Sequence, residues 1–348
     1  MAVTPHEVPV AVAAGADAWE PVQDVRGIPG LQLAASPRHA TVLLITGTVP
    51  DGDREALHRV HDQLPRPRAV VAWRPAEAAA EVPAQTVDGD LDALVDALRE
   101  AQAAVLADPE RGADDLLPDT EPNEWRGVGP FGQGGEGMMG GTPYGRPMTT
   151  TGDDHDGLAL DQLDLTFGPF LDPLPGGCRL TVTLQGEVLQ EVELTVREAG
   201  DHPFAHPTDA GLRTARHLLR RTAHGLHVAG LDALASRAAA LAGRISDDAD
   251  RTALVRDANR LGRRILRSGL LWTLRGVGTI DGVDAVDRWR SRLDAVAAGL
   301  DGRSAVAPAP PDHGTIEDAL AGMTLTDVMA TLASVDELVP QPAGTVAM

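Results

Sequence analysis

The chain has 348 residues, and its 51 acidic residues outnumber its 30 basic residues, all of them arginine, which gives a formal net charge of −21. So acidic a chain lacks the basic face that phosphate contacts need, which excludes nucleic acid as a general partner. No apolar run reaches about 18 residues, and no basic segment followed by an apolar one opens the chain, so neither a membrane span nor a signal peptide is expected.

Composition and length also indicate the type of core, the number of domains and the compartment. Hydrophobic residues make up 43% of the chain but aromatic residues only 3%, so we expect cores of leucine, valine and alanine. The length predicts two domains. A single cysteine, Cys178, excludes a disulfide scaffold and fits a reducing cytoplasm.

A βαβ unit is predicted near the N-terminus. Residues 41–49 are nearly all apolar and lie between the turn signals Ser36-Pro37 and Pro50-Asp51-Gly52, which is typical of a strand buried on both faces of a parallel sheet. Residues 53–64 have the apolar spacing of a helix, and residues 69–73 form a second short apolar strand.

A longer helix and a linker follow. Residues 90–107 repeat apolar side chains at helical spacing, and Asp88 or Asp90 can cap the helix. Residues 108–124 are acidic and lack periodicity, which predicts a domain boundary there. The acidic residues 88–124 and the arginine-rich residues 209–303 could face each other, or each could face a neighbouring subunit; two solvated faces are the simpler interpretation.

Two segments of the N-terminal half resemble a known family. They are ASPRHATVLLITGTV, residues 35–49, and ALHRVHDQLPRPRAVVAW, residues 56–73. They are similar to the cluster-carrying small subunit shared by the [NiFe] hydrogenases and by respiratory complex I, the NADH-quinone oxidoreductase. The resemblance covers residues 8 to 107 and implies a flavodoxin-like α/β domain. In the family, four cysteines of this domain hold a [4Fe–4S] cluster.

The chain departs from the family at every cysteine position. Ala16 and Trp19 stand in the first pair of places, Pro75 lies where the next is expected, and the Asp88 region replaces the last. A [4Fe–4S] cluster needs four thiolates or close substitutes, and Cys178 is the only cysteine. The resemblance therefore implies a degenerate iron–sulfur site, and we expect no cofactor.

Residues 127–147 hold nine glycines and three prolines among 21 residues, which excludes a helix or strand interior. They do not match a phosphate-binding loop. One interpretation is a connector that lies over a partner. The other is a small-molecule site that uses Met138, Met139, Tyr144 and Arg146.

Residues 158–197 alternate apolar and polar side chains around Gln185-Gly186-Glu187, which predicts antiparallel strands. They resemble the N-terminal hairpin of the hydrogenase large subunit and of the quinone-site subunit of complex I. The family's loop histidines, expected near the quinone, are absent from Gly168-Pro169-Phe170-Leu171-Asp172-Pro173. Cys178 begins a strand and is best interpreted as a small buried residue.

Residues 208–243 and 247–300 are predicted to be helical, with Thr208 and Asp209 as first caps. Their resemblance to the large subunit is weaker, and the family's two C-x-x-C pairs, which hold nickel, are absent. An arginine face opposite an apolar stripe predicts a partner-docking surface; its members are Arg256, Arg260, Arg263, Arg264 and Arg267.

Two further clusters invite a metal-site interpretation without matching a known ligand pattern. His217, His224 and His227 lack a carboxylate or cysteine at matching spacing, and surface or capped histidines are the preferred interpretation. Residues 153–156 are acidic but lack the pattern of a calcium loop. We therefore predict no metal site.

The predicted organisation has four parts. Residues 1–107 form a degenerate small-subunit-like α/β domain, and residues 108–157 an acidic linker with the glycine-rich loop. Residues 158–303 form a truncated large-subunit-like α+β domain of antiparallel hairpin and helix bundle. Residues 304–348 form a Pro/Ala linker, one short helix over residues 316–332 that docks in cis or on a partner, and a flexible tail.

The resemblance implies a fused, non-catalytic structural or regulatory subunit of a complex I-like or [NiFe]-hydrogenase-like assembly, whose partners are the other subunits. Such a chain is not expected to be an enzyme by itself. It would be cytoplasmic, or peripheral on the cytoplasmic face of the membrane through those partners. Two alternatives stay open: a module that binds a quinone or nucleotide through the glycine-rich loop, and an oxidoreductase component whose redox centre a partner supplies.

Overall fold

The computed structural model describes residues 7–75, 82–118, 150–153, 157–197, 206–303, 310–338 and 340. Its first half is a five-stranded, wholly parallel sheet with the order β2-β1-β3-β4-β5. The strands are β1 (Val8–Ala14), β2 (Leu31–Leu33), β3 (Val42–Gly47), β4 (Ala69–Pro75) and β5 (Gln85–Val87). This order is that of the flavodoxin-like doubly wound sheets, so the predicted fold class of this half is confirmed.

The central strand β3 is buried at all six positions, as its apolar run predicts. Val42 and Leu44 point into one core, and Leu43 and Ile45 point into the other, because successive side chains of a strand alternate. The first core is closed by α3 (Leu91–Ala107), α1 (Trp19–Val22) and the 3₁₀ helix Gln23–Gly27, and the second by α2 (Arg54–Asp62).

The start of α3 confirms the predicted cap. The Asp90 carboxylate accepts a hydrogen bond from the Ala93 backbone N–H at 3.1 Å, which satisfies one of the free donors of the first helical turn. The described part of the acidic linker turns back to the α/β half, where Asp115 pairs with Arg68 at 2.7 Å. This part therefore does not face the arginine-rich helices.

The second half combines an antiparallel sheet with helices, so the predicted α+β class is confirmed as well. The sheet order is β6-β7-β8-β9, and its strands are β6 (Thr150–Asp153), β7 (Ala159–Phe167), β8 (Cys178–Gln185) and β9 (Val188–Val196). Strand β6 lies where the sequence predicted only linker. Its pairing with β7, from Thr150 opposite Gln162 to Asp153 opposite Ala159, stabilises it.

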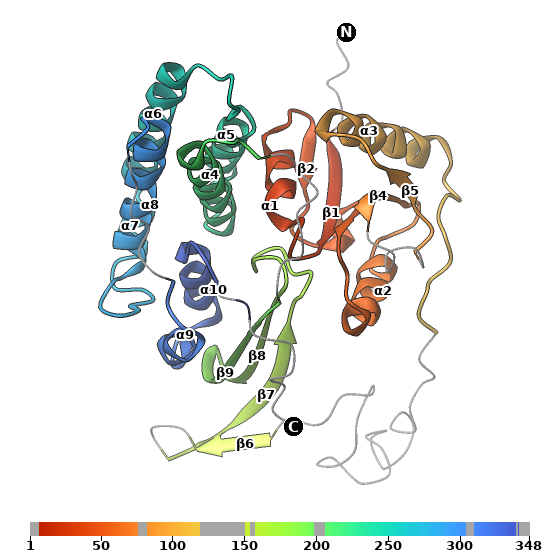
Figure 1. The fold of residues 1–348 in the computed structure, drawn as a ribbon. Helices are drawn as coiled ribbons and strands as arrows, with labels where there is room; N and C mark the ends of the chain where they lie inside the picture. The colour runs from red at the N-terminus through yellow and green to blue at the C-terminus, as the bar shows by residue number, and fades with distance from the viewer. Residues whose placement is uncertain are drawn as a thin grey trace, which may run out of the picture.

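The helices of this half form a group beside the α1 side of the first sheet (Figure 1). They are α4 (Ala210–Val228), α5 (Asp232–Gly243), α6 (Arg251–Arg267), α7 (Leu270–Thr273) and α8 (Ala285–Leu300). Asp209 caps α4 by accepting from the Leu212 N–H at 2.9 Å, as predicted. Trp289, 1% exposed, lies in their core, so the expectation of a leucine, valine and alanine core needs correction.

The single helix predicted over residues 316–332 is two helices, α9 (His313–Leu320) and α10 (Leu325–Ser334). Gly322, with a φ of 81°, breaks the helix, because side chains other than glycine rarely adopt this backbone conformation. Both helices pack against the antiparallel sheet through Ile316, Leu320, Val328 and Leu332, so the segment docks in cis.

The two halves are joined by buried ion pairs. Asp53, 2% exposed at the start of α2, accepts from Arg179 of β8 and, at 2.9 Å, from Arg197 after β9. Arg26, in the 3₁₀ helix after α1, pairs with Asp172 of the loop before β8 at 2.6 Å. Each pair links residues more than a hundred positions apart, so the relative placement of the halves depends on side chains of both.

Candidate functional site

The positions where the family carries cysteines lie along the carboxyl edge of the parallel sheet. Ala16 follows β1, Trp19 begins α1, Pro75 ends β4, and Asp88 follows β5. The carboxyl ends of parallel strands meet at one edge, which is where open α/β sheets bind their ligands. The backbone framework is therefore the one that the resemblance implies.

The side chains at these positions do not fit a [4Fe–4S] cluster. The Trp19 indole is 9% exposed and lies edge-on to His224, with ring centroids 4.8 Å apart. Trp73 Nε1 and Arg74 Nε, at the end of β4, both donate to the Gly89 carbonyl at 3.0 Å. These groups are N–H donors, whereas iron needs thiolate ligands. No redox step is derived for this site.

Gly176 shows how tightly Trp19 is held. A Cβ added at Gly176 would lie 2.2 Å from the Trp19 Cβ, so the loop before β8 approaches Trp19 more closely than any side chain would allow. A Cβ at Gly177 would lie 2.6 Å from that of Ala16. The loop before β8 therefore packs closely on Ala16 and Trp19, two of the positions where the resemblance implies cysteines.

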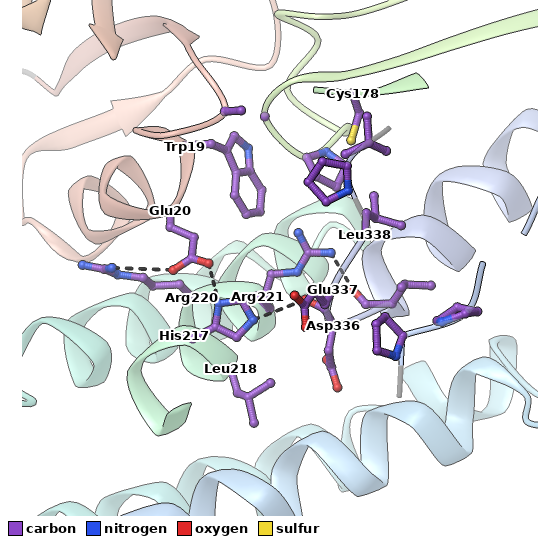
Figure 2. A pocket seen from close by; sticks show the side chains of 18 of the residues that line it. Trp19, Glu20, Cys178, His217, Leu218, Arg220, Arg221, Asp336, Glu337 and Leu338 are labelled. Atoms are coloured by element: carbon purple, nitrogen blue, oxygen red, sulfur yellow. Dashed lines mark hydrogen bonds and ion pairs between the residues drawn. The ribbon is translucent and has the colours of Figure 1, made fainter. Parts of the chain in front are cut away.

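A cavity of about 870 Å³ opens beside Trp19, between the two halves (Figure 2). Its walls come from the β1–α1 connection, the start of β8, one face of α4, and the residues that follow α10. The charged and polar groups include Glu20, His217, Arg220, Arg221 and Asp336, and the apolar wall includes Trp19, Cys178, Val196, Ile280 and Leu338.

Glu20 is the centre of a hydrogen-bonded network in this cavity. It bonds His217 Nδ1 and lies 3.8 Å from Arg220 Nη1, and His217 Nε2 contacts the Asp336 carbonyl at 3.3 Å. Burial by itself would raise the pKa of Glu20, but the hydrogen bond to His217 and the charges of His217, Arg220 and Arg221 lower it to about 2. Glu20 is therefore a fixed negative charge at neutral pH and not a general acid.

The three histidines of α4 each bond a carboxylate or a backbone carbonyl. His227 bonds Asp172 at 2.5 Å and Asp232 at 2.6 Å, whereas His224 bonds the Asp172 carbonyl at 3.1 Å. His224 is fully buried, so its interpretation as a surface or capped histidine is wrong: it is a core residue at the junction of the halves. In the described part of the chain, no group of three or more potential ligand residues is placed to hold a metal ion.

Asp172, in the loop before β8, is the centre of a charged cluster at the junction of the halves. Helix α4 presents His224 and His227 to it, and the 3₁₀ helix after α1 presents Arg26. Burial favours a high pKa for Asp172, but Arg26 and His227 hold it below its usual value. Sequence reasoning missed this cluster because its members are 55 and 146 positions apart.

Cys178 is fully buried and begins β8, as predicted. Burial raises the pKa of its thiol to about 12, against a smaller opposite effect of Arg221. A thiol is nucleophilic only as the thiolate, so Cys178 is inert at neutral pH.

The arginine face predicted on α6 lies at the surface. Arg256, Arg260, Arg263, Arg264 and Arg267 are all exposed, while Leu254, Ala258, Leu261 and Ile265 of the same helix are buried. The glycine-rich loop, with Met138, Met139, Tyr144 and Arg146, lies outside the described residues.

Sequence reasoning missed Trp272, in the short helix α7. It is 77% exposed and stacks with Arg275, whose Cζ lies 4.9 Å from the ring centroid. Helix α7 directly follows α6 in the chain, and Trp272 comes five residues after Arg267. The leucines around it look like core in the sequence, so no periodic signal marks Trp272 as exposed.

Comparison with known proteins gives one short match to report. No protein-family model matches the chain. A protein of Pyrococcus furiosus described as probable membrane-bound hydrogenase subunit mbhJ is 44% identical over 43 residues, 12% of this chain. The match spans only about a quarter of that protein's length, 26%.

The fold and this match together support a relationship to hydrogenase- and complex I-like proteins, without placing the chain in one family. None of the helices in the described ranges has the length and apolar character needed to cross a bilayer.

Proposed function

We propose that the chain is a structural or regulatory subunit of a hydrogenase-like or complex I-like assembly and carries no redox centre of its own. The observation that supports this most directly is Trp19, whose ring lies at a position where the related subunits carry a cysteine. Gly176 and His224, from the half that resembles the large subunit, pack against it. The two halves thus pack closely against each other at Trp19, one of the positions where a cluster ligand would stand.

The docking surface for the neighbouring subunit is the arginine face of α6 together with Trp272. Arg263, Arg264 and Arg267 are exposed, and within the described ranges none forms an ion pair with an acidic side chain. Tryptophan and arginine are enriched among the residues that dominate binding energy at protein interfaces. In a chain of net charge −21, this local positive patch favours an acidic partner surface.

The experiment is affinity purification of the tagged chain from its native host, followed by identification of the co-purified proteins and by iron and nickel analysis. We expect cluster-bearing subunits in the complex. We also expect no stoichiometric iron or nickel in the chain purified alone.

The triple variant Arg263→Glu, Arg264→Glu, Arg267→Glu is expected to lose these partners, since it reverses the charge of the docking surface. The matched control reverses the exposed residues Arg59, Arg66 and Arg99 of the α/β half and should keep them. A monomer that holds iron, or loss of partners in the control alone, would contradict the proposal.

A further inference from the structure

Arg221, in the middle of α4, is a buried cation that no carboxylate of the described residues pairs with directly. It is 5% exposed, and its Nη2 donates to the Val335 carbonyl at 2.5 Å. Its Nε, also buried, has no hydrogen-bond partner among the same residues. Burying a charge without such a partner is costly. Of its neighbours in the cavity, Glu20 bonds His217, and Arg220 pairs with Glu20 and Asp24.

The charges of Asp336 and Glu20 compensate Arg221 only in part, because burial and Arg292 together outweigh them. Arg292 of α8 lies close enough to lower its pKa, and the carboxylate nearest to this group, Asp336, pairs with Arg292. Glu20 acts on Arg221 only at longer range. Arg288 donates to one hydroxyl and to two backbone carbonyls. The carboxyl end of α10 adds only about half a negative charge. The three guanidinium groups are those of Arg221, Arg288 and Arg292. Among the described residues, they have between them one directly paired carboxylate, Asp336, and the carboxyl end of α10.

The Arg221 guanidinium reaches into the cavity between Trp19 and Leu338, below Cys178 (Figure 2). Its Cζ lies 5.1 Å from the centre of the Trp19 ring. The cavity of about 870 Å³ is within the usual size of small-molecule sites, roughly 300–1,000 Å³. Apolar side chains line the space around the cation, among them Val196 and Ile280.

The geometry points to a binding site for an amphipathic anion, in which an anionic head pairs with Arg221 and an apolar tail lies along the Trp19, Val196, Ile280 and Leu338 wall. A carboxylate is the head that this site fits, because a planar carboxylate accepts two parallel hydrogen bonds from a guanidinium edge. Within the described residues, Nη2 of Arg221 already donates to the Val335 carbonyl, and Nε is the donor left without a partner. The site is separate from the docking surface on α6.

The test is isothermal titration and thermal unfolding of the full chain with decanoate, decanol and decyl phosphate, each below its micelle concentration. Decanoate is expected to bind and to raise the melting temperature, whereas decanol, with the same tail, should bind at least about tenfold more weakly because it lacks the charge. Stronger binding of decyl phosphate than of decanoate would also support the site and would assign the head to phosphate.

Two variants of Arg221 separate binding from folding. Arg221→Met should still unfold cooperatively and lose decanoate binding, and Arg221→Lys, which keeps the charge, should retain part of it. Arg237→Gln, at an exposed arginine of α5, is the matched control and should bind as the native chain does. Equal binding of decanol and decanoate, or undiminished decanoate binding by folded Arg221→Met, would overturn the proposal. So would a native chain that binds neither anion.

Discussion

Asp24 and Arg220 form a two-pronged ion pair across the junction of the halves, with Arg220 Nε 2.9 Å from Asp24 Oδ1 and Nη2 2.5 Å from Oδ2. Asp24 is 5% exposed and Arg220 is 2% exposed, although 196 positions separate them. Arg216 also donates to Asp24, at 3.2 Å. A buried carboxylate between two arginines makes the orientation of the halves depend on this contact.

Replacing Asp24 by alanine is expected to destabilise the chain by about 3–5 kcal/mol, since it leaves buried guanidinium groups without their counter-charge. Urea denaturation followed by circular dichroism measures this loss. The double variant Asp24→Ala, Arg220→Met should recover much of the stability. Asp51→Ala, at a carboxylate that is 89% exposed, is the control and should cost less than about 1 kcal/mol. A loss at Asp24 no larger than at Asp51 would show that the pair does not hold the halves together.

Gly27→Ala is expected to push the halves apart locally. A Cβ at Gly27 would lie 2.5 Å from the Ala240 backbone nitrogen of α5, and backbone cannot move aside as a flexible side chain can. We expect a lower melting temperature with a loss of about 1–3 kcal/mol, the usual cost of overpacking.

Gly262→Ala, in the middle of α6, is the matched control, because nothing lies within 4 Å of its added Cβ. It should stabilise the chain by up to about 1 kcal/mol through helix propensity. The same change in stability at both glycines would contradict the close approach of Gly27 to α5.

Because His224 is buried, the free energy of unfolding should depend on pH in the mildly acidic range. Burial, with the charge of Arg221, lowers its pKa to about 3, so between pH 3 and 6.5 the unfolded chain binds a proton that the folded chain does not. The free energy of unfolding should therefore fall as the pH drops through this window. From pH 7 to pH 5 this residue alone should remove about 2 kcal/mol.

The variant His224→Gln keeps a donor for the Asp172 carbonyl and should lose this part of the pH dependence. His227 provides an internal comparison by NMR titration. Burial opposes its protonated form, but the hydrogen bonds to Asp172 and Asp232 and the charge of Asp172 together outweigh burial and raise its pKa. Its contribution is therefore present below pH 6.5 and is lost as the pH rises through its folded value. If both imidazoles titrate together near 6.5, the buried geometry is wrong.

Cys178 is expected to resist alkylation in the native chain. With its thiol pKa raised to about 12, almost no thiolate is present at pH 8, and the side chain is fully buried. Iodoacetamide should label it slowly in buffer and rapidly in urea, as read by intact mass. Rapid labelling of the folded chain would contradict this burial.

Local sequence signals predicted strands β3 and β4 of the parallel sheet and most of the helices. Strand β3 is buried at every position because both of its faces are covered, and Asp90 and Asp209 cap helices through contacts three residues away. Such patterns can be predicted from the sequence because the interacting residues lie within a few positions of each other. The break at Gly322 and strand β6 escaped prediction, since one depends on docking against β9 and the other on pairing with β7.

Only the tertiary structure decided what surrounds the replaced cysteine positions. The sequence showed that Ala16 and Trp19 cannot bind iron, but the packing of Gly176 and His224 on Trp19 comes from distant segments. The pairing of Asp24 with Arg220 likewise depends on distances between elements that no spacing encodes. Charge balance in a buried site is a property of the assembled fold, because it depends on which side chains meet there.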